Sequence, residues 1–138
     1  HLDNFGNNLL YFLIKGYSKS RHEQFISKLE LFKAYNFDIK SSQKSGKNWY
    51  HLAVEKQSTE LIKMASTFDQ DINAKDKTGN TPLLIAAMKV KDPSILKLLI
   101  DLGANKAIKT EFDESAYDLA NENELLTNEK AGIEFLKL

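Results

Sequence analysis

The sequence has no cysteine, only two prolines and a single arginine among its 138 residues. Without cysteine the protein can form neither a disulfide nor a cysteine-rich zinc site, and it has no thiol for nucleophilic chemistry. The missing cysteines do not indicate a cellular compartment, because cytoplasmic and exported proteins can both lack them. Localisation is therefore left open, and disulfide scaffolds and thiol enzymes are excluded.

Long apolar runs and a net charge are also missing. The longest apolar run, from Leu9 to Ile14, has six residues, whereas a transmembrane helix needs roughly 18 or more. Nineteen basic and 19 acidic residues cancel, and a neutral chain with one arginine has little electrostatic footprint for nucleic acid. We expect a soluble folded domain that neither inserts into a membrane nor binds nucleic acid. From Glu111 onward, eight acidic residues stand against two lysines, so the body of the chain is basic and its last part acidic.

A short turn-and-helix pattern recurs along the chain at a nearly fixed spacing. Its clearest copy begins at Gly79 and reads Gly-Asn-Thr-Pro-Leu; related copies begin 33 residues earlier, at Gly46, and 34 residues later, at Asp113. A weaker copy begins at Gly6, 40 residues before Gly46, which predicts an insertion near residues 16–20. Periods of roughly 20 to 50 residues are typical of stacked units that bury their apolar faces against each other.

Local signals predict two helices in each unit. The Thr81 hydroxyl can accept a hydrogen bond from a first helical turn, and the proline after it suits the first helical position, so a short helix should run to about Lys89. Asp92 and its following proline repeat this arrangement, and Gly103 can adopt the left-handed conformation that ends a helix. Each unit is therefore expected to contain a helix, a tight turn, a second helix and a loop.

The outer units carry a serine followed three residues later by an acidic residue, which is the capping-box pattern. It occurs at Ser20 with Glu23, before a long second helix of the first unit, and at Ser115 with Asp118 in the last unit. After the last of these helices we expect a polar loop over residues 121–128. The sequence leaves open whether the apolar group that follows this loop completes a second helix.

The 33-residue period, the Thr-Pro-Leu stretch at Thr81 and the later Gly-Ala-Asn stretch at Gly103 resemble the ankyrin repeat. The resemblance implies an all-α fold, an ankyrin-repeat solenoid of stacked helix-turn-helix units joined by hairpin-like loops. It also implies that His51 makes a structural hydrogen bond between units. The chain would be one domain of about four repeats, the first and last degenerate. These four units span about residues 3–42, 43–75, 76–109 and 110–138.

The resemblance implies a non-catalytic module that binds a partner protein through its loop tips and the concave face of its first helices. Mapped onto this sequence, the candidate partner-binding residues are Lys44, Lys47, Lys75, Lys77, Asn80, Met88, Lys109 and Phe112. The helix positions expected to face the groove are Lys15, Glu55, Met88 and Glu122. The five lysines of the first set form a predicted basic ladder, which suits an acidic protein surface. A row of exposed lysines is also compatible with a plain solvated surface.

No combination of residues in the sequence predicts catalysis. The stretch around Lys47 lacks the serine or threonine that must follow the lysine of a phosphate-binding loop. His1, His22 and His51 lack enough histidine or carboxylate partners at metal-ligand spacing to build a site. His22 is expected to be a solvated residue near a helix start. We therefore expect no enzyme activity, no catalytic residues, no cofactor and no metal.

The first unit departs from the pattern in a way that suggests a neighbour. Residues 9–14 are apolar on nearly every side, whereas a terminal repeat should have a polar outer face. We therefore expect the chain to be the C-terminal part of a longer array, with further repeats or self-association covering this end. An alternative function follows, in which the chain is a structural or regulatory scaffold segment that packs against another domain of the same longer protein.

Overall fold

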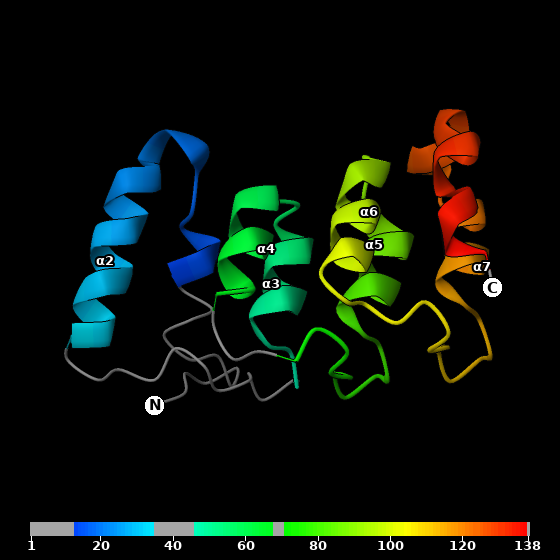
Figure 1. The fold of residues 1–138 in the computed structure, drawn as a ribbon, viewed down its shortest axis with the longest axis horizontal. Coiled ribbons are helices and arrows are strands. Elements are labelled where there is room, and N and C mark those ends of the chain that lie inside the picture. The colour runs from blue at the N-terminus through cyan, green and yellow to red at the C-terminus, as the bar shows by residue number, and fades with distance from the viewer. Residues whose placement is uncertain (1–12, 35–45, 68–70, 138) are drawn as a thin grey trace.

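The computed structural model describes residues 13–34, 46–67 and 71–137, and within these ranges every regular element is helical. The helices stand side by side in a row, with the long loops over residues 71–81 and 102–115 at one edge of it (Figure 1). The elements are η1 (Lys19–Arg21), α2 (His22–Ala34), α3 (Trp49–Glu55), α4 (Thr59–Ala65), α5 (Pro82–Lys89), α6 (Pro93–Asp101), α7 (Ala116–Glu122) and η2 (Glu124–Leu136). This architecture confirms the predicted all-α solenoid.

The helices form two layers. The first helices of successive units contact each other, α3 against α5 and α5 against α7, while α4 contacts α6 and α6 contacts η2. Within a unit the two helices also pack together, as α3 does with α4 and α5 with α6. Each unit therefore buries its apolar surface against its own partner helix and against the neighbouring units, as a stacked repeat requires.

Side-chain caps fix where the helices begin. Each of five helices is preceded by an extended residue whose side chain accepts a hydrogen bond from the first turn. These caps are Asn48, Ser58, Thr81, Asp92 and Ser115. A cap of this kind contributes about 1 kcal/mol to helix stability. The predicted starts of α5 and α6 and the predicted capping box of α7 are confirmed, and Gly103 after α6 has the expected positive φ of 109°.

The predicted capping box of Ser20 with Glu23 is wrong. Ser20 lies inside the 3₁₀ turn η1, and the extended residue before that turn is Ser18, whose side chain makes no capping hydrogen bond. The chain passes directly from η1 into α2, because His22 already has helical dihedral angles. An N-cap needs extended backbone geometry, so no cap can form between the two elements.

The predicted polar loop over residues 121–128 is also wrong. Residues 121 and 122 complete α7, and η2 begins at Glu124 after a single intervening residue, Asn123. The Asn123 side chain accepts a hydrogen bond from the Leu125 amide at 2.9 Å, which starts the second element immediately. Leu126 and Leu136 are fully buried. The last unit therefore has a second helical element, held to the stack by its apolar residues.

Small side chains let the first helices approach each other closely. Ala53, Ala86 and Ala120 occupy corresponding positions in three successive units, and all three are fully buried. In the first unit Leu13 stands at this position and is followed by Ile14, and both are buried. The first unit therefore fills with larger side chains the space that alanine leaves in the other units.

Expectations about residues 3–12 fall outside the described ranges. Residues 16–20, where an insertion is expected, form a turn and the start of η1, and His22, expected to be solvated, is half-buried with Nδ1 3.0 Å from the Tyr17 hydroxyl oxygen. Within those ranges, no helix combines the length and the apolar composition needed to cross a membrane.

Candidate functional site

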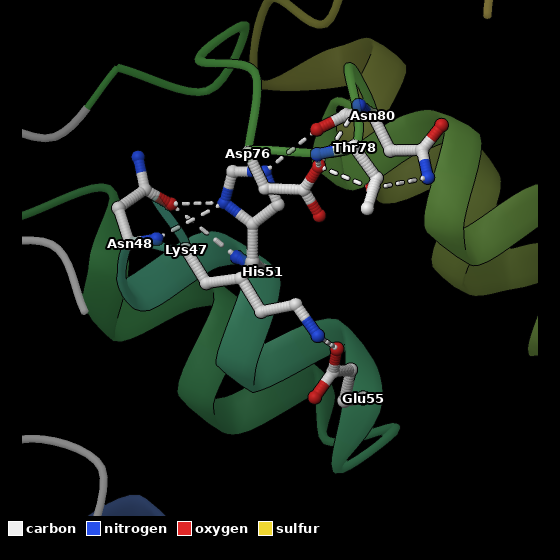
Figure 2. Close-up of polar contacts among 7 residues, drawn as sticks. All are labelled: Lys47, Asn48, His51, Glu55, Asp76, Thr78 and Asn80. Atoms are coloured by element: carbon white, nitrogen blue, oxygen red, sulfur yellow. Dashed lines mark hydrogen bonds and ion pairs between the residues drawn. The ribbon is translucent and has the colours of Figure 1, made fainter. Parts of the chain in front are cut away.

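The loop that opens the third unit is held by one buried carboxylate. Asp76 Oδ1 accepts hydrogen bonds from the Thr78 amide at 2.9 Å, the Thr78 hydroxyl at 2.7 Å and the Asn80 amide at 3.0 Å. The Asp76 amide in turn donates to the Asn80 carbonyl at 2.9 Å. Gly79 closes the turn with a φ of 83°, a conformation that glycine adopts without steric cost. These bonds fix the shape of the loop from Asp76 to Asn80 (Figure 2).

The Asp76 carboxylate keeps its charge in this setting. Burial alone would raise the pKa of Asp76, but the hydrogen bonds from Thr78 and Asn80 favour the ionised form and together lower the pKa below its ordinary value. Donors within its own loop thus bind Oδ1 of a charged carboxylate, which organises the loop.

His51 joins α3 to this loop. Its ring is fully buried, with Nε2 at 3.0 Å from the Asn80 carbonyl oxygen and Nδ1 at 3.1 Å from the Asn48 amide (Figure 2). A carbonyl oxygen can only accept, so Nε2 carries the proton and Nδ1 accepts from Asn48. Burial lowers the pKa of His51, although the Asn80 carbonyl opposes this, so the ring is neutral at pH 7. The predicted structural hydrogen bond between units is confirmed.

Gly46 sets the distance between consecutive loops. It has a φ of 82°, and a Cβ atom at this position would lie 3.0 Å from both Asp76 Cα and the Lys77 amide nitrogen. A distance of 3.0 Å is tighter than most real Cβ contacts, and backbone moves aside less easily than the end of a side chain. The loops of the second and third units therefore touch through their backbones at Gly46.

A groove of about 310 Å³ lies at this junction, where the third-unit loop meets the exposed faces of α3 and α5. Its lining residues are Lys47, Glu55, Asp76, Lys77, Thr78, Asn80, Ile85, Met88 and Lys89. Four of the eight predicted partner-binding residues, Lys47, Lys77, Asn80 and Met88, are among them. The structure thus brings together loop-tip and helix positions that are up to 41 residues apart in the sequence.

Apolar atoms and lysines share the lining. Met88 is 36% exposed and lies one helical turn from Ile85, so the two side chains share a face of α5. Lys47 extends along α3 and forms an ion pair with Glu55 (Figure 2). Lys77 and Lys89 are exposed, and within the described ranges neither forms an ion pair. The groove can therefore hold an apolar group while offering two uncompensated ammonium groups.

The other predicted residues lie elsewhere. Lys75 is exposed but does not line the groove. Lys109 belongs to the next loop and lies 3.5 Å from the Asp113 carboxylate, and Phe112 in the same loop is 82% exposed. Lys44 lies outside the described residues. Two members of the predicted basic ladder, Lys47 and Lys109, are thus engaged by neighbouring carboxylates.

Ile85 and Lys89 are among the lining residues that were not predicted. Ile85 precedes Met88 by three residues, and this spacing alone places both on one helix face. Lys89 is the last residue of α5, and its place in the groove depends on where that helix ends against the loop of its own unit. The place of Ile85 in the groove could have been predicted from that of Met88, whereas the place of Lys89 depends on the tertiary structure.

The described residues contain no cluster of three or more histidine, cysteine or acidic side chains able to hold a metal ion. A family model of ankyrin repeats, in three copies, matches residues 4–110. No curated protein matches the chain. Ankyrin repeats are generally protein–protein interaction modules and typically lack catalytic activity. Because the model matches well over half of the sequence and the fold agrees with it, the chain belongs to the ankyrin repeat family.

Proposed function

We propose that this chain is a non-catalytic module that binds a partner protein in the groove between its second and third units. The observation that carries the proposal is the composition of that groove, where an apolar floor of Ile85 and Met88 lies beside the exposed lysines Lys77 and Lys89. Partner sites on proteins combine apolar contacts with a polar rim in this way. The partner surface would be acidic, and the chain would act as one domain of four units over residues 1–138.

The scaffold supports this function because it holds the groove in one shape. The Asp76 carboxylate fixes the loop tip, His51 ties that loop to α3, and Gly46 fixes the spacing of consecutive loops. A site whose residues are held in place before binding loses less conformational entropy on association.

Partner capture with matched charge variants tests the proposal. The wild-type protein, Lys77→Glu and Met88→Asp would be immobilised and exposed to an extract of the source cells. Lys63→Glu serves as the control, since Lys63 is exposed on α4 and does not line the groove. Thermal unfolding of each variant would show that the fold is kept.

We expect the wild type and Lys63→Glu to retain the same partner and both groove variants to lose it. Equal retention by all four proteins would contradict binding in the groove. If the wild type retains no specific partner, the module itself is contradicted, and the alternative is favoured, in which the chain packs as a scaffold segment against another domain of the same longer protein.

A further inference from the structure

We infer that the groove takes a short, extended, acidic segment of the partner carrying one apolar side chain, and that Glu55 competes with this segment for Lys47. The inference rests on the proposed function and goes beyond it by naming the chemistry of the occupant and an internal group that limits its affinity. Its starting point is the ion pair between Lys47 and Glu55, both of which line the groove.

The charges of the groove favour an anionic occupant. Of the five charged lining residues, three are lysines and two are carboxylates. The Asp76 carboxylate is buried, and donors of its own loop bind its Oδ1. Three lysines against two carboxylates leave the lining with one net positive charge. Lys77 and Lys89 are left to meet carboxylates of a partner, and Lys47 is available only if Glu55 releases it.

The dimensions and floor of the groove favour an extended segment. Helix α5 along one side has eight residues, a length of about 12 Å at 1.5 Å per residue. An extended chain covers that distance with about four residues. Ile85 and Met88 supply one apolar contact zone in the same groove as the lysines, and a methionine side chain adapts readily to different apolar groups. An acidic segment with a single apolar residue fits this combination of contacts.

Glu55 is placed to act as an internal substitute for a partner carboxylate. The Lys47 and Glu55 side chains are 27% and 30% exposed, so a carboxylate from solution can reach the pair and replace Glu55. Glu55 is also the last residue of α3, an end where the helix dipole disfavours a negative charge. The Glu55 carboxylate thus contributes little to the stability of α3, while its ion pair engages Lys47, which lines the groove.

The test measures binding of a defined acidic peptide by fluorescence anisotropy. The probe is a labelled five-residue peptide with leucine at its centre and glutamate at the other four positions, and its control replaces every glutamate with glutamine. The proteins are wild type, Glu55→Gln, Lys77→Gln and Asp101→Asn. The last is the matched control, because Asp101 pairs with Lys97 at 3.1 Å on α6, outside the groove. Its substitution also removes one negative charge and releases one lysine.

We expect Glu55→Gln to bind the acidic peptide about two- to fivefold more tightly than the wild type, as is typical when one exposed charge interaction changes. Asp101→Asn should match the wild type, and Lys77→Gln should bind more weakly. The gain should shrink at high salt, because exposed charges are screened, and the glutamine peptide should show no gain.

Two results would overturn the inference. Equal affinities of Glu55→Gln and wild type, with Lys77→Gln still weakened, would show that Glu55 does not compete, while leaving the groove as the binding site. Failure of all four proteins to bind the acidic peptide would show that the occupant is not acidic. Neither result bears on the proposed function, which the capture experiment tests separately. That function is contradicted only if the groove variants keep their partner or the wild type captures none.

Discussion

The loops that open the third and last units use the same hydrogen bonds but different residues. At the position of Asp76 the last unit has Thr110, whose hydroxyl accepts from the Phe112 amide at 3.1 Å and the Glu114 amide at 3.2 Å. Its backbone amide donates to the Glu114 carbonyl at 2.9 Å, as the Asp76 amide does in the third unit. The loop shape is thus set by a side-chain acceptor at its first position, and either a carboxylate or a hydroxyl can supply it.

The links between units differ more. His51 joins α3 to the third-unit loop, but Leu84 stands at the corresponding position of α5 and cannot donate to the last loop. There the cross-link comes from Asn123, whose side-chain amide donates to the Ala87 carbonyl at 3.1 Å and the Val90 carbonyl at 3.0 Å. The polar link between successive first helices therefore moves from the loop edge to their far end, while Lys106 joins the same two units through the Phe135 and Lys137 carbonyls at 3.1 and 2.8 Å. The groove lies at the junction between the second and third units, where His51 fixes the loop.

Substituting the loop glycines should give the largest difference between the two junctions. Gly46→Ala should lower the free energy of unfolding by about 3 kcal/mol, because it combines a positive φ with a contact against the Asp76 backbone. Gly79→Ala should cost about 1 kcal/mol, since its Cβ would meet only the Glu111 side chain, at 3.2 Å. Urea unfolding of both variants measures the difference, and equal losses would show that the backbone contact at Gly46 is not tight.

Replacing His51 by leucine makes the junction between the second and third units resemble that between the third and last units, where Leu84 stands at this position. His51→Leu removes the donor to the Asn80 carbonyl and the capping interaction with Asn48, which should cost about 2 kcal/mol in unfolding free energy. Amide hydrogen exchange should also become faster in the loop from Asp76 to Asn80. Unchanged exchange in this loop would mean that Asp76 alone holds it, and the proposed difference between the junctions would be lost.

The buried histidine also predicts a pH dependence. Because burial lowers the pKa of His51 in the folded state, the unfolded chain binds more protons once the pH falls below the ordinary value of about 6.5. The stability associated with the neutral ring is therefore complete above about pH 6.5 and is lost as the pH falls through the lowered folded pKa. Urea midpoints of wild type and His51→Leu from pH 8 to 5 would show this. If the urea midpoints of both proteins fell in parallel, the pH dependence would come from groups other than His51.

The smallest effect concerns the strained turn of the last unit. Asp113 has a φ of 63° where the third unit has Gly79, and a non-glycine residue pays a steric cost in this conformation. Asp113→Gly should raise the free energy of unfolding by about 0.5 to 1 kcal/mol. The exposed pair with Lys109 that it removes contributes little, and Lys109→Ala measures that contribution separately. Destabilisation by Asp113→Gly would contradict strain at this turn.

Much of the fold could be predicted because its signals are local. Thr81 and Asp92, each followed by proline, specify the starts of α5 and α6, and the glycine spacing specifies the period. The wrong predictions fall in the first and last units. Ser20 has the sequence pattern of a helix cap but lies within a 3₁₀ turn. The residues after α7 are mostly polar and therefore predict a loop. They form η2 because Leu126 and Leu136 are buried against the neighbouring helices. Such tertiary contacts cannot be read from nearby residues.

Part of the candidate site was predictable in its positions, but its charge state was not. The repeat spacing predicts Lys47, Lys77, Asn80 and Met88 as partner-binding candidates, and the structure brings these four to one groove. Repeat spacing does not distinguish one lysine from another, whereas Lys47, which precedes α3, is paired with Glu55 at the last residue of that helix. Whether a lysine is free depends on side-chain reach across the folded surface, which repeat spacing does not encode.

The central claim is that partners bind in the groove between the second and third units. Chemical-shift mapping by NMR, with the acidic five-residue peptide added to the ¹⁵N-labelled protein, tests it most directly. We expect the perturbed amides to cluster in the loop from Asp76 to Asn80 and on α5 around Ile85 and Met88, with little change on α6. Perturbations centred on the exposed Phe112 loop or spread over the second helices, with the groove unchanged, would contradict the claim.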